Sequence, residues 1–188
     1  SESKVVPFQP EFEHFYTSID VDLDETKTEA FEALYQETLK QGMGRAVDYS
    51  LPYPKHEFLH FLVVTKGLLT HGSGNPDIDV LRPFRWGVDS AAHGDVSGIY
   101  AEKGYMRPIY FAVINSARCF GQHNGVFDVN EAGERSEQED LGRYQRFYKL
   151  TIGSNGVRRD PWQTGMVYVL PPETFEYRNE WTSRVPVR

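Results

Sequence analysis

Hydrophobic positions follow a helical spacing in the first part of the chain and a strand-like spacing in the last part. Apolar residues recur at intervals of three and four ahead of Gly42: Phe31, Leu34, Tyr35 and Leu39. This spacing predicts an amphipathic helix that Gly42 ends. Residues 26–29 read Thr-Lys-Thr-Glu, which has the form of a capping box and predicts where that helix begins.

The pattern downstream predicts shorter elements. These are a helix over 56–65, strands over 68–70, 96–101, 146–152 and 166–170, and a helix over 106–117. Residues 120–142 are polar with glycine turns, which predicts a mobile insert without regular structure. Helices come first and strands follow with one intervening helix, which favours an α+β class. We expect a single domain over 1–188, with a helical N-terminal arm over 1–66 and a core over 67–188. Within the arm, residues 1–23 are expected to be extended and partly anchored.

Charge is unevenly distributed along the chain. Residues 1–43 hold ten acidic side chains and three lysines, and so account for the net charge of −7 of the 188-residue protein. The rest is balanced and has no basic run dense enough for a dedicated nucleic-acid stripe. Cys119 is the only cysteine, which excludes an intramolecular disulfide, and no run of 18 apolar residues occurs. These features predict a cytoplasmic protein with no membrane partner.

One motif has the form of a zinc site. Residues 56–60 read His-Glu-Phe-Leu-His, and two histidines four residues apart share one face of a helix, with the glutamate as general base. No downstream helix offers an obvious third ligand, although His71, His93 and His123 are present. Packing of a short amphipathic helix explains the same residues. A zinc-dependent hydrolase is therefore the alternative hypothesis, and we assign no metal ligand.

A candidate site for a flat ligand extends over 67–114. His71, Gly72 and Ser73 end an apolar strand, Tyr100 lies on the next predicted strand, and Tyr110 lies on the helix after it. Histidine and serine can bond ligand hydroxyls, glycine allows a ligand amide to approach the backbone, and two tyrosine rings can enclose a heteroaromatic group. A strand-ending turn and two half-buried core tyrosines explain the same residues without a ligand.

These motifs resemble those of the ADP-ribosyltransferases. The series THGS, SGIYA with a second tyrosine ten residues on, and MVYVL is similar to the branch with diphtheria toxin, the poly-ADP-ribose polymerases and the tRNA 2′-phosphotransferases. The resemblance implies a split antiparallel sheet with NAD as substrate. It implies that His71 and Ser73 contact the adenosine ribose and that the Gly72 backbone pairs with the nicotinamide carboxamide. It also implies that Tyr100 and Tyr110 sandwich the nicotinamide ring.

Two positions depart from the family pattern. The family glutamate corresponds to Thr164, which has no charge to stabilise an oxocarbenium-like transition state, and a serine that holds the nicotinamide amide corresponds to Pro108. With Tyr100 and Thr164 at the catalytic positions, poly-chain elongation is not expected. Mono-ADP-ribosyl transfer, NAD cleavage with Glu102 or Glu173 as replacement acid, and a non-catalytic binding domain all stay open. So do the acceptor, protein or nucleic acid, and the oligomeric state.

Overall fold

The chain combines helices with antiparallel strands, which confirms the α+β class. The structure is a computed structural model, and it describes residues 11–42, 44–78, 84–85, 97–98, 100–136, 145–154, 160–177 and 184–186. Its contacts divide the chain into two compact units. The first unit comprises Ser1–Asp20 and Val113–Thr164, and the second comprises Val21–Ala112 and Gly165–Arg188.

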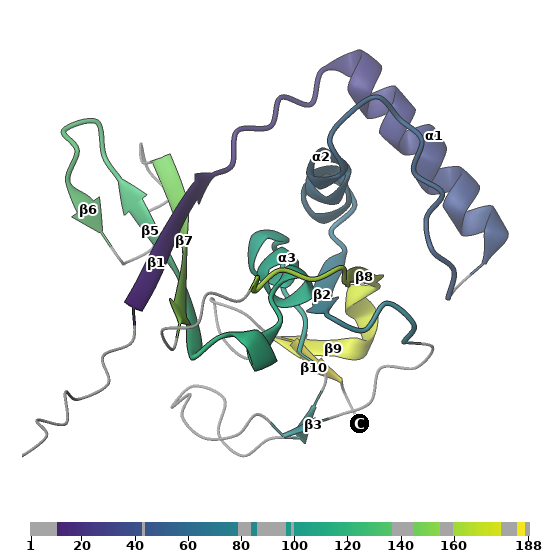
Figure 1. Ribbon diagram of the computed structural model, residues 1–188. Coiled ribbons are helices and arrows are strands. Elements are labelled where there is room, and N and C mark those ends of the chain that lie inside the picture. Colours follow the sequence, from purple (N-terminus) through teal and green to yellow (C-terminus); the bar gives the residue numbers. More distant parts are fainter. Residues whose placement is uncertain are drawn as a thin grey trace, which may run out of the picture. The chain divides into compact units, whose positions relative to one another are not determined.

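A four-stranded antiparallel sheet forms the centre of the first unit (Figure 1). In spatial order its strands are β1 (Glu11–Ser18), β7 (Gln145–Ser154), β5 (Gly121–Val129) and β6 (Arg135–Ser136). Leu150 and Ile152 project from β7 toward one face and are buried there. On that same face Phe15 meets Trp162, with ring centroids 5.6 Å apart. The backbone of Trp162 in turn bridges Ile114, which precedes the short helix η2 (Ser116–Arg118).

Two strands of this sheet differ from the sequence prediction. Residues 11–18 form β1 and pair with β7, whereas the sequence predicted an extended, partly anchored arm over 1–23 and no place for it in a sheet. Residues 121–129 form β5, whereas a structureless insert was predicted over 120–142. Both strands are rich in polar residues or glycine, and their pairing partners lie far along the chain. Local pattern therefore carried little information about them. The strands predicted over 146–152 and 166–170 are confirmed as β7 and β8 (Met166–Leu170).

The second unit begins with two packed helical segments. They are α1 (Glu25–Gln41) and α2 (Lys55–His60), and α2 continues as one π-helical segment, η1 (Phe61–Thr65). Their apolar faces share a buried cluster of Phe31, Phe58, Phe61 and Leu62. Burial of these three aromatic rings and one leucine is the main apolar contribution that joins α1 to α2.

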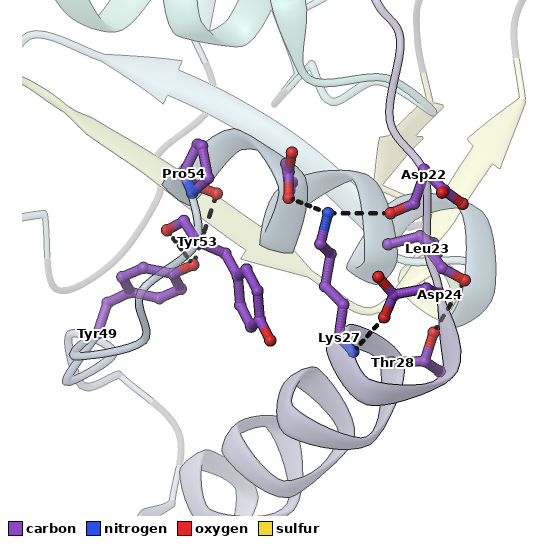
Figure 2. Close-up of polar contacts among 9 residues, drawn as sticks. Asp22, Leu23, Asp24, Lys27, Thr28, Tyr49, Tyr53 and Pro54 are labelled. Carbon is purple, nitrogen blue, oxygen red and sulfur yellow. Dashed lines mark hydrogen bonds and ion pairs between the residues drawn. The ribbon is translucent and has the colours of Figure 1, made fainter.

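The predicted start of α1 is wrong by two residues. Asp24, not Thr26, is the N-cap, and its carboxylate accepts a hydrogen bond of 2.8 Å from the Lys27 backbone N–H (Figure 2). An aspartate at this position satisfies a free backbone donor and also places negative charge at the positive end of the helix dipole. The predicted end is confirmed, because Gly42 is the C-cap with φ of +89°.

Lys27 also links α1 to α2. Figure 2 shows its side chain extending from α1, where the ammonium bonds the Asp22 carbonyl at 3.0 Å. The same ammonium lies 2.8 Å from the Glu57 carboxylate and 5.4 Å from the centre of the Tyr53 ring. The hydrogen bond to Glu57 raises the pKa of Lys27. Tyr53 is held in turn, since its carbonyl accepts a 2.7 Å bond from the Tyr49 hydroxyl.

The rest of the second unit is built from short strand pairs and one helix. β2 (Leu69–Ser73) pairs with β8, β3 (Phe84–Arg85) with β4 (Ser97–Gly98), and β9 (Phe175–Tyr177) with β10 (Arg184–Pro186). Helix α3 (Met106–Val113) ends four residues earlier than predicted (Figure 1). Of the strand predicted over 96–101, residues 97–98 form β4, and residues 96 and 99 lie outside the described residues.

Helix α3 approaches β2 and β8 at two glycines. A Cβ atom added to Gly72 would lie 1.7 Å from the Pro108 carbonyl oxygen, and one added to Gly165 would lie 2.0 Å from that of Ala112. Pro108 and Ala112 are four residues apart and so occupy one face of α3. The two glycines therefore allow the helix backbone to rest directly on the strand pair.

Candidate functional site

His71 is held in a defined orientation by the backbone of Tyr100. The Nδ1 atom of His71 lies 2.6 Å from the Tyr100 carbonyl oxygen. A carbonyl only accepts, so Nδ1 carries the proton of this bond, and the neutral ring then presents Nε2 as an acceptor. Strand β2 supplies His71, and its register with β8 sets Tyr168 opposite, with the two ring centroids 6.4 Å apart. The structure thus brings together His71 and Tyr100, two of the residues that the sequence predicted for one site.

Ser73 begins a turn that Tyr168 fastens to the strand pair. The Ser73 hydroxyl accepts a 3.1 Å bond from the Asn75 N–H. The Tyr168 hydroxyl donates to the Asn75 carbonyl at 2.7 Å and accepts from the Ile78 N–H at 3.0 Å. Both ends of this turn are therefore fixed by one phenol. Ser73 has a structural role here in addition to the ligand contact that the resemblance implies.

Gly72 and Tyr110 both lie against α3. The Pro108 carbonyl occupies the space where a Gly72 side chain would lie, so helix packing already requires glycine at this position. Tyr110, on α3, is only 8% exposed. Tyr100 is half-buried on the segment that runs beside β2. The predicted stacking of a ligand between the two tyrosine rings stays a prediction.

A buried ion pair lies two residues beyond Tyr100. Glu102 exchanges two backbone hydrogen bonds of 2.9 Å with Thr70 of β2, and its carboxylate lies 3.0 Å from the Arg107 guanidinium in the first turn of α3. Both side chains are largely buried. Burial raises the pKa of Glu102 to about 7, although Arg107 acts in the opposite direction. A carboxyl group with this pKa can hold or release a proton near neutral pH.

The His-Glu-Phe-Leu-His motif forms α2 as predicted, but its side chains diverge into separate contacts. His56 is exposed, Glu57 is ion-paired with Lys27, and the His60 Nδ1 lies 3.2 Å from the Tyr105 hydroxyl. Burial lowers the pKa of His60. Among the residues that the structure describes, no three metal-ligating side chains are grouped to hold an ion. These contacts favour a packing role for the motif.

Thr164 and Glu173 are the remaining predicted residues. Thr164 is exposed and is the last residue of the first unit, whereas the other predicted site residues belong to the second. Glu173 is exposed in the short helix η3 (Pro172–Thr174).

Sequence reasoning missed Arg107 and the fastening role of Tyr168. The only signal for Arg107 was a basic residue five positions after Glu102, which is weak because such spacings are common. The sequence MVYVL predicted a buried strand, but it did not indicate what the hydroxyl of Tyr168 would bind.

Comparisons with known proteins assign no function to the residues of this site. No family model, curated protein or solved structure matches the chain. None of the helices in the described part of the chain has the length and apolar character needed to cross a bilayer.

Proposed function

We propose that the second unit binds NAD or a related nucleotide along the edge of β2, beside His71 and Tyr100. The observation that carries the proposal is the 2.6 Å bond from His71 Nδ1 to the Tyr100 carbonyl. This bond fixes both the ring orientation and the tautomer, so Nε2 accepts from a donor such as a ribose hydroxyl. The ADP-ribosyltransferase resemblance assigns a ribose contact to the same histidine.

The backbone of β2 offers hydrogen-bonding groups for the carboxamide of nicotinamide. The N–H and C=O of Thr70 both bond Glu102, on the edge of β2 away from β8. Because backbone groups alternate along a strand, the N–H and C=O of Gly72 face the same edge. A carboxamide has one donor and one acceptor group and matches this pair. The ligand amide would therefore bind the backbone N–H and C=O of Gly72 at the edge of β2, while α3 covers the face of the strand where a side chain of residue 72 would lie.

For the reaction, we propose mono-ADP-ribosyl transfer or NAD cleavage with Glu102 as the acidic residue. When the nicotinamide–ribose bond breaks, its electron pair moves to the ring nitrogen, nicotinamide leaves as a neutral molecule, and positive charge develops on the ribose. Water, or a nucleophile of the acceptor, then bonds the anomeric carbon and loses a proton. Thr164 has no charge to stabilise this state, whereas an ionised carboxylate does. With a pKa of about 7, Glu102 is ionised in part of the molecules at neutral pH.

Titration calorimetry with NAD and with nicotinamide tests the binding step. We expect both ligands to bind the full chain and His71→Ala to weaken NAD about three- to tenfold, the effect of losing one hydrogen bond. His56→Ala is the matched control, because this histidine is exposed on α2. Absence of NAD binding by the wild-type protein, or equal binding by His71→Ala, would contradict the proposed site.

Release of free nicotinamide, measured by chromatography, separates an enzyme from a binding domain. We expect Glu102→Gln to reduce the release rate at an unchanged affinity for NAD. Glu173→Gln should release nicotinamide as the wild type does. A wild-type protein that binds NAD without releasing nicotinamide would be a non-catalytic binding domain on this scaffold, and the role of Glu102 would then be structural.

A further inference from the structure

One face of the first-unit sheet carries exposed aromatic rings, and we call it the aromatic face. It is the face toward which Phe12, His14 and Tyr16 project from β1, because alternate residues of a strand share a side. The register places Gly153, Thr151 and Lys149 of β7 beside them in that order. The opposite face holds the buried residues of β7 and the contact between Phe15 and Trp162 described above.

Exposed and buried rings lie side by side on this face. Phe12 and Tyr16 are 53% and 54% exposed. Beside them, the buried Phe127 and the half-buried Phe147 stack with centroids 5.5 Å apart and an interplanar angle of 13°. Tyr16 packs edge to face against Phe127, with centroids 6.1 Å apart. This contact holds the Tyr16 ring in place without covering it.

The charges on the aromatic face are positive. Lys149 places its ammonium 5.8 Å from the centre of the Tyr16 ring, and the Arg135 guanidinium lies 4.0 Å from that of Phe127. In the part of the sheet that the structure describes, no acidic residue occupies a strand position on this face. Glu13 and Asp128 project from the other one. This separation of charge suits an anionic ligand, although the chain as a whole is acidic.

Glycines lie beside the rings on this face. Gly121 pairs with Gly153 across β5 and β7, and Gly125 pairs with Lys149 next to Tyr16. The Phe12 ring covers Gly153, which is buried, and an added Cβ there would lie 3.1 Å from the ring. Gly121 is exposed and Gly125 is half-buried, so at these two positions a flat group can approach the strand backbone.

We infer that the aromatic face binds single-stranded nucleic acid. Phe12, His14 and Tyr16 follow one another at steps of about 6.7 Å, twice the rise per strand residue. This step exceeds the spacing of about 3.4 Å between stacked bases of a duplex, so each ring receives a base of an extended, unstacked strand. Lys149 and Arg135 contact the phosphates. Exposed rings, positive charge and tolerance of any base are the features of sequence-independent single-strand binding.

Fluorescence anisotropy with a labelled 12-nucleotide oligothymidylate and the full chain tests this inference. Two phosphate contacts predict a slope of about −1.4 in log affinity against log salt, so affinity falls about sevenfold between 50 and 200 mM salt. Lys149→Gln should reduce that fall to about 2.6-fold. A duplex of the same length should bind more weakly, because its bases cannot stack on the rings.

Variants of β1 distinguish stacking from general charge attraction. Tyr16→Ala should weaken binding about 5- to 150-fold, and Phe12→Ala similarly, whereas Tyr16→Phe keeps the ring and the affinity. Thr17→Ala is the matched control, because it is the exposed neighbour on the opposite face. Circular dichroism confirms that each variant is folded.

Four results would overturn the inference. They are no binding at low salt, equal affinity for the duplex, wild-type affinity in both alanine variants of the rings, and self-association of the chain that Tyr16→Ala abolishes without any binding of the oligonucleotide. This surface belongs to the first unit, so such a result would not bear on the proposed NAD site.

Discussion

Substituting Gly72 by alanine tests the packing of α3 on the strand pair. The added Cβ would lie 1.7 Å from the Pro108 oxygen and 2.5 and 2.8 Å from its carbonyl carbon and Cα. All three are backbone atoms and cannot rotate away, so α3 must shift by roughly 1 Å or more before the added Cβ and the Pro108 oxygen reach an ordinary contact distance. We expect a loss of about 3 kcal/mol in the free energy of unfolding, the upper end of the range for overpacked cores. That loss corresponds to a fall of about 6–12 °C in Tm for a chain of this length.

Urea denaturation followed by circular dichroism measures this loss, and hydrogen exchange locates it. Amides of β2, α3 and β8 should exchange faster in Gly72→Ala. Gly104→Ala is the control, since its Cβ would lie 3.7 Å from the nearest atom, the Glu102 Oε2. Gly165→Ala should destabilise as well, and the double variant should lose less than the sum, because one displacement of α3 relieves both contacts. A Gly72→Ala protein within about 0.5 kcal/mol of the wild type would refute the packing argument.

Three further predictions concern the cap of α1, the buried carboxyl and the turn after β2. Asp24→Ala should cost about 1 kcal/mol in urea denaturation, whereas Thr26→Ala should cost less than half of that; the reverse order would restore the predicted capping box. Glu102 binds a proton in the folded protein up to a pKa of about 7 and in the unfolded chain only up to its ordinary value of 4.5, so stability should fall as pH rises between these values. Between pH 4.5 and pH 8 this titration should lower the free energy of unfolding by about 3 kcal/mol, and Glu102→Gln should lack that decrease. The same decrease in both proteins would contradict the prediction. Tyr168→Phe should destabilise by about 1 kcal/mol and speed hydrogen exchange at Ile78, and unchanged exchange there would show that the phenol does not fasten the turn.

Elements with a strong local pattern were predicted from the sequence. The apolar spacing around Phe31 gave α1, and the continuous apolar run over 166–170 gave β8. The cap was placed at Thr26 because Thr-Lys-Thr-Glu fits a capping box, yet Asp24 offers a charged acceptor at the right distance. Propensity rules rank both residues as good caps, so only the packed geometry decides between them.

Elements defined by distant pairing were not predictable. β5 has two glycines and several polar residues, and it becomes a strand because β7 pairs with it along its whole length. At the candidate site, a motif suggested that His71 and Tyr100 belong together. The bond itself joins a side chain to a backbone carbonyl, and no residue type signals such a bond. The Glu102–Arg107 pair likewise depends on where α3 begins relative to β2.

Each of the two units is built from two separate segments of the chain, and this has a consequence for how the protein folds during synthesis. The chain runs from the first unit to the second, back to the first, and again to the second. His14 lies 137 residues from its partner Thr151, so β1 must wait on the ribosome until most of the protein has been made. β2 likewise waits for β8. Neither unit completes its sheet early in translation, and nascent chains will expose unpaired strand edges for longer than in a protein whose domains follow one another.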